Sequence, residues 1–443
     1  MDGVCWWIRI CWRHHFWCAS TDELFCYTAY CNGENGEGMR YKPRVLDLFC
    51  GAGGLSLGFE RAGCKIVGGI ELEHWPCMTH HRNFPDCEVT LGPTDISMVD
   101  PAALGLKPGS VDILIGGPPC QGFSQVGRAK IRSLGQERER DRKNRLYREF
   151  IRFLDYLQPA YFVIENVQGM KTFKSSRFLD QVLEELSHGY GNYKFSSNRG
   201  YEVQAKVLCA VDYGVPQVRY RLFIIGRRRD CTDLTIRFPE AAVSEPITLH
   251  DAISDLPRLE APVLSTKSAS FLINSGIKQE DRPKSYRTIP ENNYQRVMRE
   301  GSGNRVLNHV CRGHNKKDLE IFALLRQGEK YADLPAKHRR YRDDIFDDKY
   351  RRLKANQPCW TLTAHMQKDC LAYIHPRQTR SLSTREAARI QSFPDSFIFE
   401  GPLTKVFRQV GNAVPPLLAE QVALGLVSQL SRRRSELIHR ARV

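Results

Sequence analysis

The sequence predicts an α/β fold built around a doubly wound sheet. Apolar segments of strand length alternate with helical patterns through the first half of the chain, and a glycine-rich turn connects the first segment to the first helix. This rhythm is lost between about residues 229 and 375. The change of pattern indicates a second, smaller domain of irregular structure.

The first repeat begins with a strand at residues 44–49, followed by the turn 51–54 and a helix that ends before Gly63. A second strand at 65–70 ends at Glu71. A strand, a crossover helix and a second strand, with an acidic residue about twenty positions after the glycine turn, are typical of a nucleotide-type pocket.

Three acidic residues are expected where strands end: Asp47, Glu71 and Asp95. Carboxylates repel a pyrophosphate, and the glycine turn carries no lysine. A ligand with a ribose diol, an amino group and an adenine amine suits this set better, and S-adenosylmethionine has all three. The glycine turn alone leaves a dinucleotide as the alternative.

A third strand is expected at residues 111–115, where it meets a Gly-Gly-Pro-Pro turn and then Cys120. The prolines fix φ and prevent a helix from following, so the thiol is held in one orientation. An inert buried cysteine is the alternative. The position at the carboxyl end of a strand favours a reactive thiol in a cleft.

Residues 121–145 form a polar segment with many more arginines and lysines than acids. A solvated loop or an insertion would explain it, as would a loop that closes over a phosphate backbone. A helix at 146–157 and a strand at 161–164 follow, with Glu165 at the end of the strand. A thiol and a carboxyl, each at the end of a buried strand, are the groups that attack on a pyrimidine ring requires.

Two further strands are expected, at about residues 203–211 and at 222–225. Between them Gln217, Arg219 and Arg221 alternate, so we expect them on one face of a strand. A solvated sheet edge is the alternative explanation of this pattern.

The formal net charge of +15 favours a polyanionic partner such as nucleic acid. The fifteen cysteines include no Cys-x-x-Cys pair, which suits reduced thiols in a cytosolic protein. No run approaches the roughly 18 apolar residues of a membrane span. Residues 1–38 fit no zinc pattern and no cleaved signal, and Met39 would be a natural start for the next domain, so we predict no metal site and assign this segment no function.

Six segments, in their usual order, resemble the motifs of the DNA cytosine-5 methyltransferase family, in the form found in bacterial type II restriction–modification systems. They are Phe49–Gly54, Gly117–Ser124, Glu165–Val167, Gln217–Arg221, Arg385–Pro394 and Gly411–Pro416. The resemblance implies a Rossmann-like, S-adenosylmethionine-dependent methyltransferase domain with a smaller target-recognition domain. It covers roughly residues 44–425, and no catalytic group is missing.

The resemblance implies that Cys120 adds to C6 of cytosine and that Glu165 contacts N3 and the exocyclic amine. Arg219 would help to hold the base, and Gln217 and Arg221 complete the expected catalytic set. Because C6 lies within the base stack of a duplex, the target cytosine must be flipped out. A pKa raised by burial would let Glu165 donate the proton that N3 needs.

For the cofactor, the resemblance places Phe49 against the adenine, Glu71 on the ribose hydroxyls and Asp95 on the adenine amine. Asn412 and Val414 would return from the carboxyl end to close the site. The remaining cofactor-binding residues implied by the motifs are Gly51, Gly53, Gly54, Leu55, Leu72, Ile96 and Pro118.

In this family the segment between the Gln-x-Arg-x-Arg and Arg-Glu-Ala-Ala-Arg motifs reads the DNA. The DNA-binding residues we expect are Gln121, Ser124, Arg128, Arg305, Arg312, Thr361 and Thr363. Other candidates are His309, Lys316, Lys317, Arg339, Arg340, Arg351 and Arg352, of which fewer than half should contact DNA.

Five segments are therefore expected. They are an extension of unknown role (1–40), the catalytic and cofactor-binding domain (41–228), the target-recognition domain (229–375), a returning segment that completes the catalytic domain (376–430) and a frayed basic tail (431–443). The returning segment should contain a helix at 385–391 and an apolar helix at 417–430 that packs on the large domain.

The expected function is methylation of cytosine C5 within a short double-stranded DNA sequence. The same chemistry on tRNA and a catalytically silent DNA-binding homologue are the alternatives. We expect a cytoplasmic, nucleoid-associated bacterial monomer with no membrane partner, and a cognate restriction endonuclease, if one exists, that acts separately.

Overall fold

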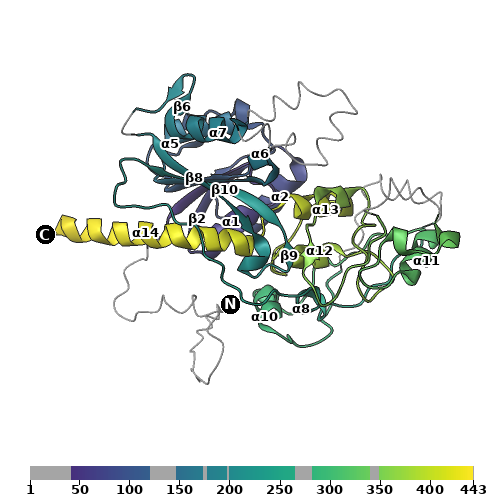
Figure 1. The fold of residues 1–443 in the computed structure, drawn as a ribbon. Coiled ribbons are helices and arrows are strands. Elements are labelled where there is room, and N and C mark those ends of the chain that lie inside the picture. The colour runs from purple at the N-terminus through teal and green to yellow at the C-terminus, as the bar shows by residue number, and fades with distance from the viewer. Residues whose placement is uncertain are drawn as a thin grey trace, which may run out of the picture. The chain divides into compact units, whose positions relative to one another are not determined.

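A seven-stranded sheet forms the centre of the described chain, which in this computed structural model comprises residues 41–119, 146–172, 177–196, 199–264, 282–339 and 349–442 (Figure 1). The strand order is β3-β2-β1-β4-β5-β10-β8. Strands β1, β2, β3, β4 and β5 are parallel, whereas β10 runs antiparallel between β5 and β8. The predicted α/β sheet is therefore confirmed.

The sheet has seven strands, and all of them except β3 agree with predicted strands to within a few residues. The seven are β1 (Arg44–Leu48), β2 (Lys65–Ile70), β3 (Val89–Thr90), β4 (Ile113–Gly116), β5 (Tyr161–Val167), β8 (Tyr201–Cys209) and β10 (Tyr220–Arg228). Shorter strands lie outside it: β6 (Gly189–Tyr190), β7 (Tyr193–Lys194), β9 (Gln217–Val218) and β11 (Cys359–Trp360).

The α-helices are α1 (Gly54–Arg61), α2 (His74–Asn83), α5 (Tyr147–Leu157), α6 (Gly169–Thr172), α7 (Arg177–His188), α8 (Leu249–Ile253), α10 (Asn293–Arg299), α11 (Lys316–Leu324), α12 (Thr384–Ile390), α13 (Leu403–Asn412) and α14 (Pro416–Arg442). Figure 1 shows α5 and α7 on one face of the sheet, with α1 and α14 on the other.

Alternation along the strands gives the sheet two hydrophobic cores. Ile113 and Ile115 of β4 face the core that contains α1 and α14, whereas Leu114 faces the core that contains α5 and α7. Strands that are buried on both faces need continuous apolar runs, which is why β1, β4 and β5 stand out in the sequence.

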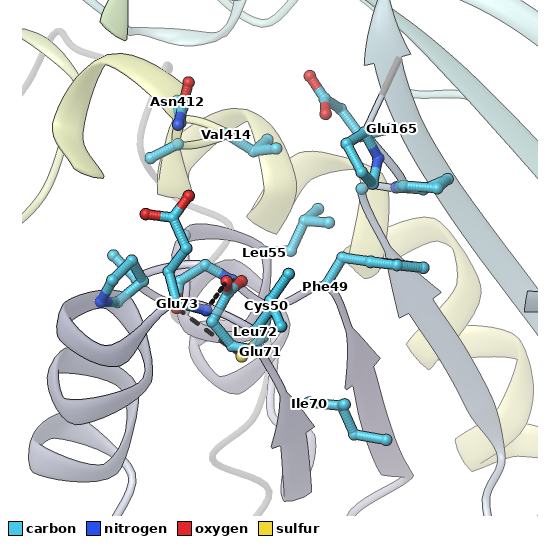
Figure 2. Close-up of a pocket in the computed structure, with 18 of the residues that line it drawn as sticks. Phe49, Cys50, Leu55, Ile70, Glu71, Leu72, Glu73, Glu165, Asn412 and Val414 are labelled. Atoms are coloured by element: carbon cyan, nitrogen blue, oxygen red, sulfur yellow. Dashed lines mark hydrogen bonds between the residues drawn. The ribbon is translucent and has the colours of Figure 1, made fainter. Parts of the chain in front are cut away.

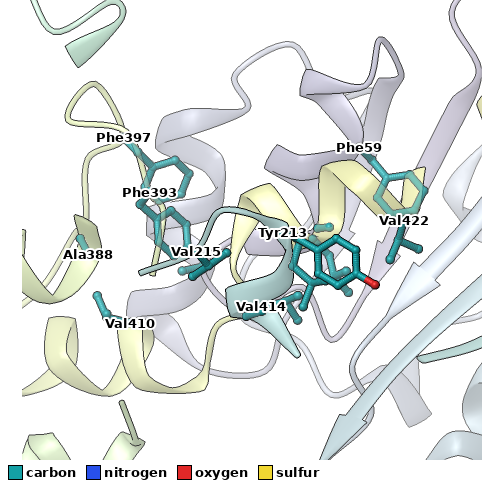
Figure 3. Close-up of a cluster of buried hydrophobic side chains, with 14 of the residues drawn as sticks. Phe59, Tyr213, Val215, Ala388, Phe393, Phe397, Val410, Val414 and Val422 are labelled. Carbon is teal, nitrogen blue, oxygen red and sulfur yellow. The ribbon is translucent and has the colours of Figure 1, made fainter. Parts of the chain in front are cut away.

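Helices α1 and α14 approach each other closely because α1 carries a glycine at the contact. A Cβ atom on Gly58 would lie 2.3 Å from the Cβ of Ala419 and 2.7 Å from the carbonyl oxygen of Pro416. Figure 3 shows Phe59 of α1 beside Val422 of α14, with Tyr213 and Val414 in the same cluster. This confirms that the returning segment packs on the large domain.

Helix α14 also accounts for the most apolar stretch among the described residues. The helical segment Leu403–His439, which includes α13 and most of α14, is long and apolar enough to cross a membrane by length and composition. Its 18-residue apolar window has a mean hydropathy of 1.3, but 67% of that window is buried inside the protein. Burial against α1 and the sheet explains the composition. The predicted frayed tail is corrected, because residues 431–442 continue α14 as helix.

The region after β10 has short helices and few strands, as its sequence pattern predicted. Ile321, Phe322 and Tyr350 belong to a small separate core, whereas Tyr294 and Leu353 belong to the large core that also contains α1. The domain boundaries placed at residues 229 and 376 stay predictions.

The Gln-x-Arg-x-Arg segment is not one regular strand. It divides into β9 and β10 at Arg219, and β9 pairs in parallel with β11, which lies in the predicted recognition region. The expectation of one strand face is therefore corrected. Gln217 and Arg219 are fully buried, so the solvated-edge alternative is excluded for both.

Candidate active site

A cavity of about 840 Å³ opens where the parallel strands of the sheet end. This is the edge at which doubly wound sheets bind ligands. Segments that follow β1, β2, β3 and β4, the end of β5, and α13 with the residues after it all contribute to its wall. In Figure 2, Glu73 and Asn412 lie on one side of the cavity, and Glu165 lies on the other.

The glycine turn after β1 forms the floor of the cavity. Gly53 has a φ of 97°, a left-handed conformation that favours glycine, and it precedes the first turn of α1. A Cβ atom on Gly54 would lie 2.3 Å from the carbonyl oxygen of Val414. Glycine at position 54 therefore lets the returning segment close directly over the turn.

Glu71 presents a fixed carboxylate to the cavity. Its two oxygens accept hydrogen bonds from the backbone N–H groups of Gly51 at 2.9 Å and Glu73 at 2.8 Å (Figure 2). Burial raises the pKa of this carboxyl, and the two N–H donors oppose that shift. Asp95 also lines the cavity, and its Oδ1 accepts from the backbone N–H of Ser97 at 3.0 Å.

Asp47 does not belong to this acidic set, which corrects the grouping made from sequence. Its side chain is fully buried and accepts a hydrogen bond from Ser56 Oγ at 2.7 Å. Burial raises its pKa to about 7. A strand end indicates the edge of the sheet but not the direction in which a side chain points.

Most residues expected at the cofactor do line the cavity. Those found there are Phe49, Gly51, Gly54, Leu55, Glu71, Leu72, Asp95, Ile96, Pro118, Asn412 and Val414. Gly53 is absent from the wall: a Cβ atom there would lie 2.6 Å from the ring of Phe84, behind the turn. Its role is to shape the turn.

Glu165 lies near the end of β5, on the same cavity. Arg221 Nε lies 2.8 Å from Glu165 Oε1, because Arg221 and Val167 are register partners on adjacent strands. Burial raises the pKa of Glu165, and the cations of Arg221 and Arg219 oppose the shift. The result is a buried carboxyl held in place by one guanidinium.

Arg219 has different neighbours from those expected of a base-binding residue. Its guanidinium donates to the carbonyl oxygens of Leu362 at 2.6 Å and of Gly411 and Ala413 at 3.0 Å each. Gln217 likewise donates to Gln391 and accepts from the backbone N–H of Leu362. Of the expected catalytic residues that the structure describes, Glu165 and Arg221 line the cavity, whereas Gln217 and Arg219 join the segments around it.

Five candidate residues lie outside the described part of the chain: Cys120, Gln121, Ser124, Arg128 and Arg340. The residues just before Cys120 are described, and Gly117, Pro118 and Pro119 line the cavity. Asn166 Nδ2 donates to the carbonyl oxygen of Pro118 at 3.1 Å. This bond ties the end of the Gly-Gly-Pro-Pro turn to the strand that carries Glu165.

Residues 43–428 match the family of C-5 cytosine-specific DNA methylases. The chain belongs to this family. It is 37% identical over 401 residues to the type II methyltransferase M.DdeI of Desulfomicrobium norvegicum, a match that covers 86% of this chain and 87% of the relative. It is 34% identical over 378 residues to the type II methyltransferase M1.HphI of Haemophilus parahaemolyticus, covering 85% of each.

The fold agrees with this assignment. A crystal structure described as that of a DNA modification methyltransferase encoded within a prophage (E. coli) superposes with a TM-score of 0.66 at 28% identity, covering 88% of this chain and 99% of that one. The protein is thus a DNA cytosine-5-methyltransferase, and the resemblance seen in its motifs is confirmed.

In the predicted recognition region, some candidate DNA-contacting residues are exposed and others are buried. Arg305 is exposed, and Thr361 and Thr363 are partly exposed. Arg312 is only 6% exposed and donates to the carbonyl oxygens of Met366 and Gln367, which removes it from the surface available to DNA. The same correction applies to two other candidates, His309 and Arg352.

The sequence did not identify several residues that line the cavity of the methyltransferase, among them Glu73, Lys405 and Arg408. The sequence spacing could have identified Lys405 and Arg408. Lys405 and Arg408 stand seven and four residues before Asn412, a spacing that places all three on one face of α13.

Proposed function

We propose that the enzyme methylates C5 of cytosine within one short double-stranded DNA sequence, with S-adenosylmethionine as the methyl donor and Cys120 as the nucleophile. The observation that supports this most directly is a shared cavity. The Glu165–Arg221 pair and the glycine turn with its acidic residues line the same space, so a base and a cofactor could meet there.

The described residues fit S-adenosylmethionine. Glu71 still has lone pairs for ribose hydroxyls after accepting two backbone N–H groups, and Asp95 adds a second acceptor. Phe49 offers an aromatic ring for an adenine. The carboxylates would repel a pyrophosphate, which argues against the dinucleotide alternative.

The chemistry begins from the low nucleophilicity of cytosine C5. The thiolate of Cys120 adds to C6 while Glu165 gives a proton to N3, which makes C5 the nucleophilic carbon of an enamine. S-adenosylmethionine supplies an electrophilic methyl group when it is bound. Once C5 carries the methyl group, loss of the C5 proton to solvent breaks the bond between C6 and sulfur and expels the thiolate of Cys120. N3 returns its proton to Glu165, and the aromatic ring is restored.

Burial of Glu165 supports its role as the acid. The raised pKa keeps a proton on the carboxyl at a pH where an exposed glutamate has lost it. Arg221 fixes the position of this carboxyl, and Asn166 ties the turn before Cys120 to the same strand. Neighbouring residues of β5 thus hold the acid and the turn that precedes the proposed nucleophile in the sequence.

We further propose that residues 229–375 recognise the DNA sequence and that the target cytosine is flipped out of the duplex, because C6 is covered by base stacking. The enzyme would act as a monomer in the bacterial cytoplasm, on the nucleoid, and a restriction endonuclease of the same specificity would act separately. Bisulfite sequencing of DNA from cells that express this chain would report the recognised sequence.

A covalent trap tests the mechanism. Duplex DNA with 5-fluorocytosine at the target should form a permanent adduct, because the fluorine at C5 cannot leave as a proton does. Mass spectrometry should locate the adduct at Cys120, Cys120→Ser should abolish it while DNA binding persists, and Cys87→Ser should have no effect. An adduct elsewhere, or none, would refute the proposal, and methyl transfer to tRNA rather than to duplex DNA would refute the proposed substrate.

A further inference from the structure

We infer that Glu73 and Arg408 are positioning residues for the cofactor, and that their ion pair closes the rim of the pocket and slows cofactor release. The inference rests on the proposed S-adenosylmethionine site. The two residues are 335 positions apart in the sequence, at the start of α2 and on α13, and both side chains line the cavity. The carboxylate of Glu73 accepts a hydrogen bond from the guanidinium of Arg408.

The far end of α2 is attached firmly to the returning segment. Asn83 donates to the carbonyl oxygen of Ile398 at 2.8 Å and accepts from its backbone N–H at 2.9 Å. One turn earlier, Thr79 Oγ1 accepts from the backbone N–H of Glu400 at 2.9 Å. These bonds fix the end of α2 that lies away from the cavity.

The cavity end of α2 has a weaker attachment. Glu73 precedes the first turn of α2, and its carboxylate makes no capping bond to the helix. The side chains of Arg408 and Glu73 are 29% and 39% exposed, so solvent and salt reach the pair. A helix that is fixed at one end and held by a solvent-accessible ion pair at the other can open at the rim.

Movement of Glu73 would affect cofactor binding through Glu71. The backbone N–H of Glu73 donates to Glu71 Oε1 at 2.8 Å, so the ion pair and the ribose-binding carboxylate share one short segment of chain. Figure 2 shows Glu73 on the same side of the cavity as Asn412, which follows Arg408 by one turn of α13. Loss of the ion pair therefore loosens Glu71 and the rim together.

The chain offers a matched control for this ion pair. Arg44 and Glu88 form an ion pair whose side chains are also 29% and 39% exposed, and Lys65 Nζ lies 2.7 Å from the second carboxylate oxygen of Glu88. Arg44 begins β1, at the end of the strand opposite the glycine turn, and neither residue lines the cavity. Glu88→Gln therefore removes a comparable surface charge without touching the rim.

The test measures the dissociation rate of S-adenosylmethionine and of S-adenosylhomocysteine from the full chain by stopped flow, and their affinities by equilibrium dialysis. Glu73→Gln and Arg408→Gln should each raise the dissociation rate about two- to fivefold, the range expected for a half-exposed ion pair. Glu88→Gln should match the wild type. The charge-reversed double variant Glu73→Arg/Arg408→Glu should recover part of the loss.

Two further readouts separate rim closure from a general structural effect. Raising the salt concentration should speed release from the wild type and from Glu88→Gln, but not from Glu73→Gln. In Glu73→Gln and Arg408→Gln the KM for the cofactor should rise, whereas kcat should stay the same. Dissociation rates equal to those of Glu88→Gln would overturn the inference, whereas a wild type that binds no S-adenosylmethionine would overturn the proposed function on which it rests.

Discussion

Burial and a neighbouring cation act in opposite directions on the carboxyl group of Glu165. Desolvation raises its pKa, whereas the guanidinium of Arg221, 2.8 Å away, lowers it. An acid must carry its proton to donate it, so the rate should fall as pH rises through this pKa. The strength of the cation therefore sets the position of the alkaline limb of the rate profile.

Arg221→Met should move that alkaline limb to higher pH, because the cation that lowers the pKa of Glu165 is removed. Single-turnover methylation measured across pH would show the shift, and Glu165→Gln should be severely slowed and lack the limb altogether. Arg227→Met is the control, since Arg227 lies on the same strand but pairs with Glu202. A limb that stays in place or moves to lower pH would contradict the assignment of Glu165 as the acid.

Asp47, Ser56 and His80 form a buried polar chain beneath the glycine turn. Ser56 Oγ donates to Asp47 Oδ2 at 2.7 Å and lies 3.1 Å from His80 Nε2. Desolvation raises the pKa of Asp47 to about 7 and lowers that of His80 to about 3. Both side chains are therefore neutral in the folded protein over most of the acid range.

Asp47→Asn should change how stability depends on pH. Between about pH 4 and pH 7 the unfolded chain ionises Asp47 while the folded chain does not, so this residue costs stability as pH rises, by about 4 kcal/mol at most. The contribution of His80 to stability changes with pH in the opposite direction, because its pKa is lowered in the folded protein. Urea unfolding should therefore show the Asp47→Asn variant gaining stability relative to the wild type from pH 4 to pH 7, whereas the exposed control Asp86→Asn should not.

At the scale of elements, α12 shows that the sequence pattern predicts a helix but not the surroundings of its side chains. Its alanines favour the helix predicted at residues 385–391, and the structure confirms a helix there, with a capping box between Ser383 and Glu386 that the sequence analysis did not identify. The pattern could not predict that Arg385, Glu386 and Arg389 are buried, because charged residues on a helix usually face solvent. Their partners lie in distant segments.

Arg389 illustrates this dependence on distant partners. Its guanidinium pairs with Asp255 at 2.8 Å and with Asp395 at 2.6 Å, and all three side chains are fully buried. Asp255 comes from the segment after α8, in the predicted recognition region. One residue of the returning segment therefore neutralises two buried carboxylates.

Arg389→Met should destabilise the fold by about 3–5 kcal/mol, because two buried carboxylates lose the cation that they share. Among the described residues, Asp255 keeps the cation of Arg299 at 2.6 Å, and Asp395 keeps only that of Arg385, at 3.9 Å. The free energy of unfolding from urea titration measures the loss. Arg82→Met, at an exposed position of α2, should stay within about 0.5 kcal/mol of the wild type. A change at Arg389 no larger than that of the control would show that Arg299 and Arg385 compensate fully.

The same limit on prediction explains which site residues the sequence identified. Local motifs located Glu71, Glu165 and Asn412, because each follows a strand or a short signature that determines its place. The spacing of Arg219 and Arg221 could not predict that one would contact three carbonyl groups and the other the acid, because that difference arises where the chain breaks between β9 and β10. The predictions made for Asp47 and Arg312 were wrong for a similar reason, since tertiary packing buries both side chains.

At the scale of the whole molecule, Arg219 joins three regions that are far apart in the sequence. Arg219 lies between β9 and β10. Its guanidinium donates to the carbonyl oxygen of Leu362, which lies between the expected recognition residues Thr361 and Thr363. It also contacts Gly411 and Ala413, which flank Asn412 in the wall of the cofactor cavity. One buried cation thus supports the predicted DNA-reading segment and the cofactor site together.

Arg219→Met should weaken both binding events, each by about 10- to 100-fold, because a hydrogen bond to a charged group contributes about 1.5–3 kcal/mol and both segments lose theirs. Equilibrium dialysis with S-adenosylmethionine and fluorescence anisotropy with target DNA would measure the two affinities. Gln204→Met, at an exposed position of β8, should change neither. A loss confined to DNA would mean that Arg219 serves recognition alone, whereas a parallel loss would identify it as the residue through which the two sites depend on each other.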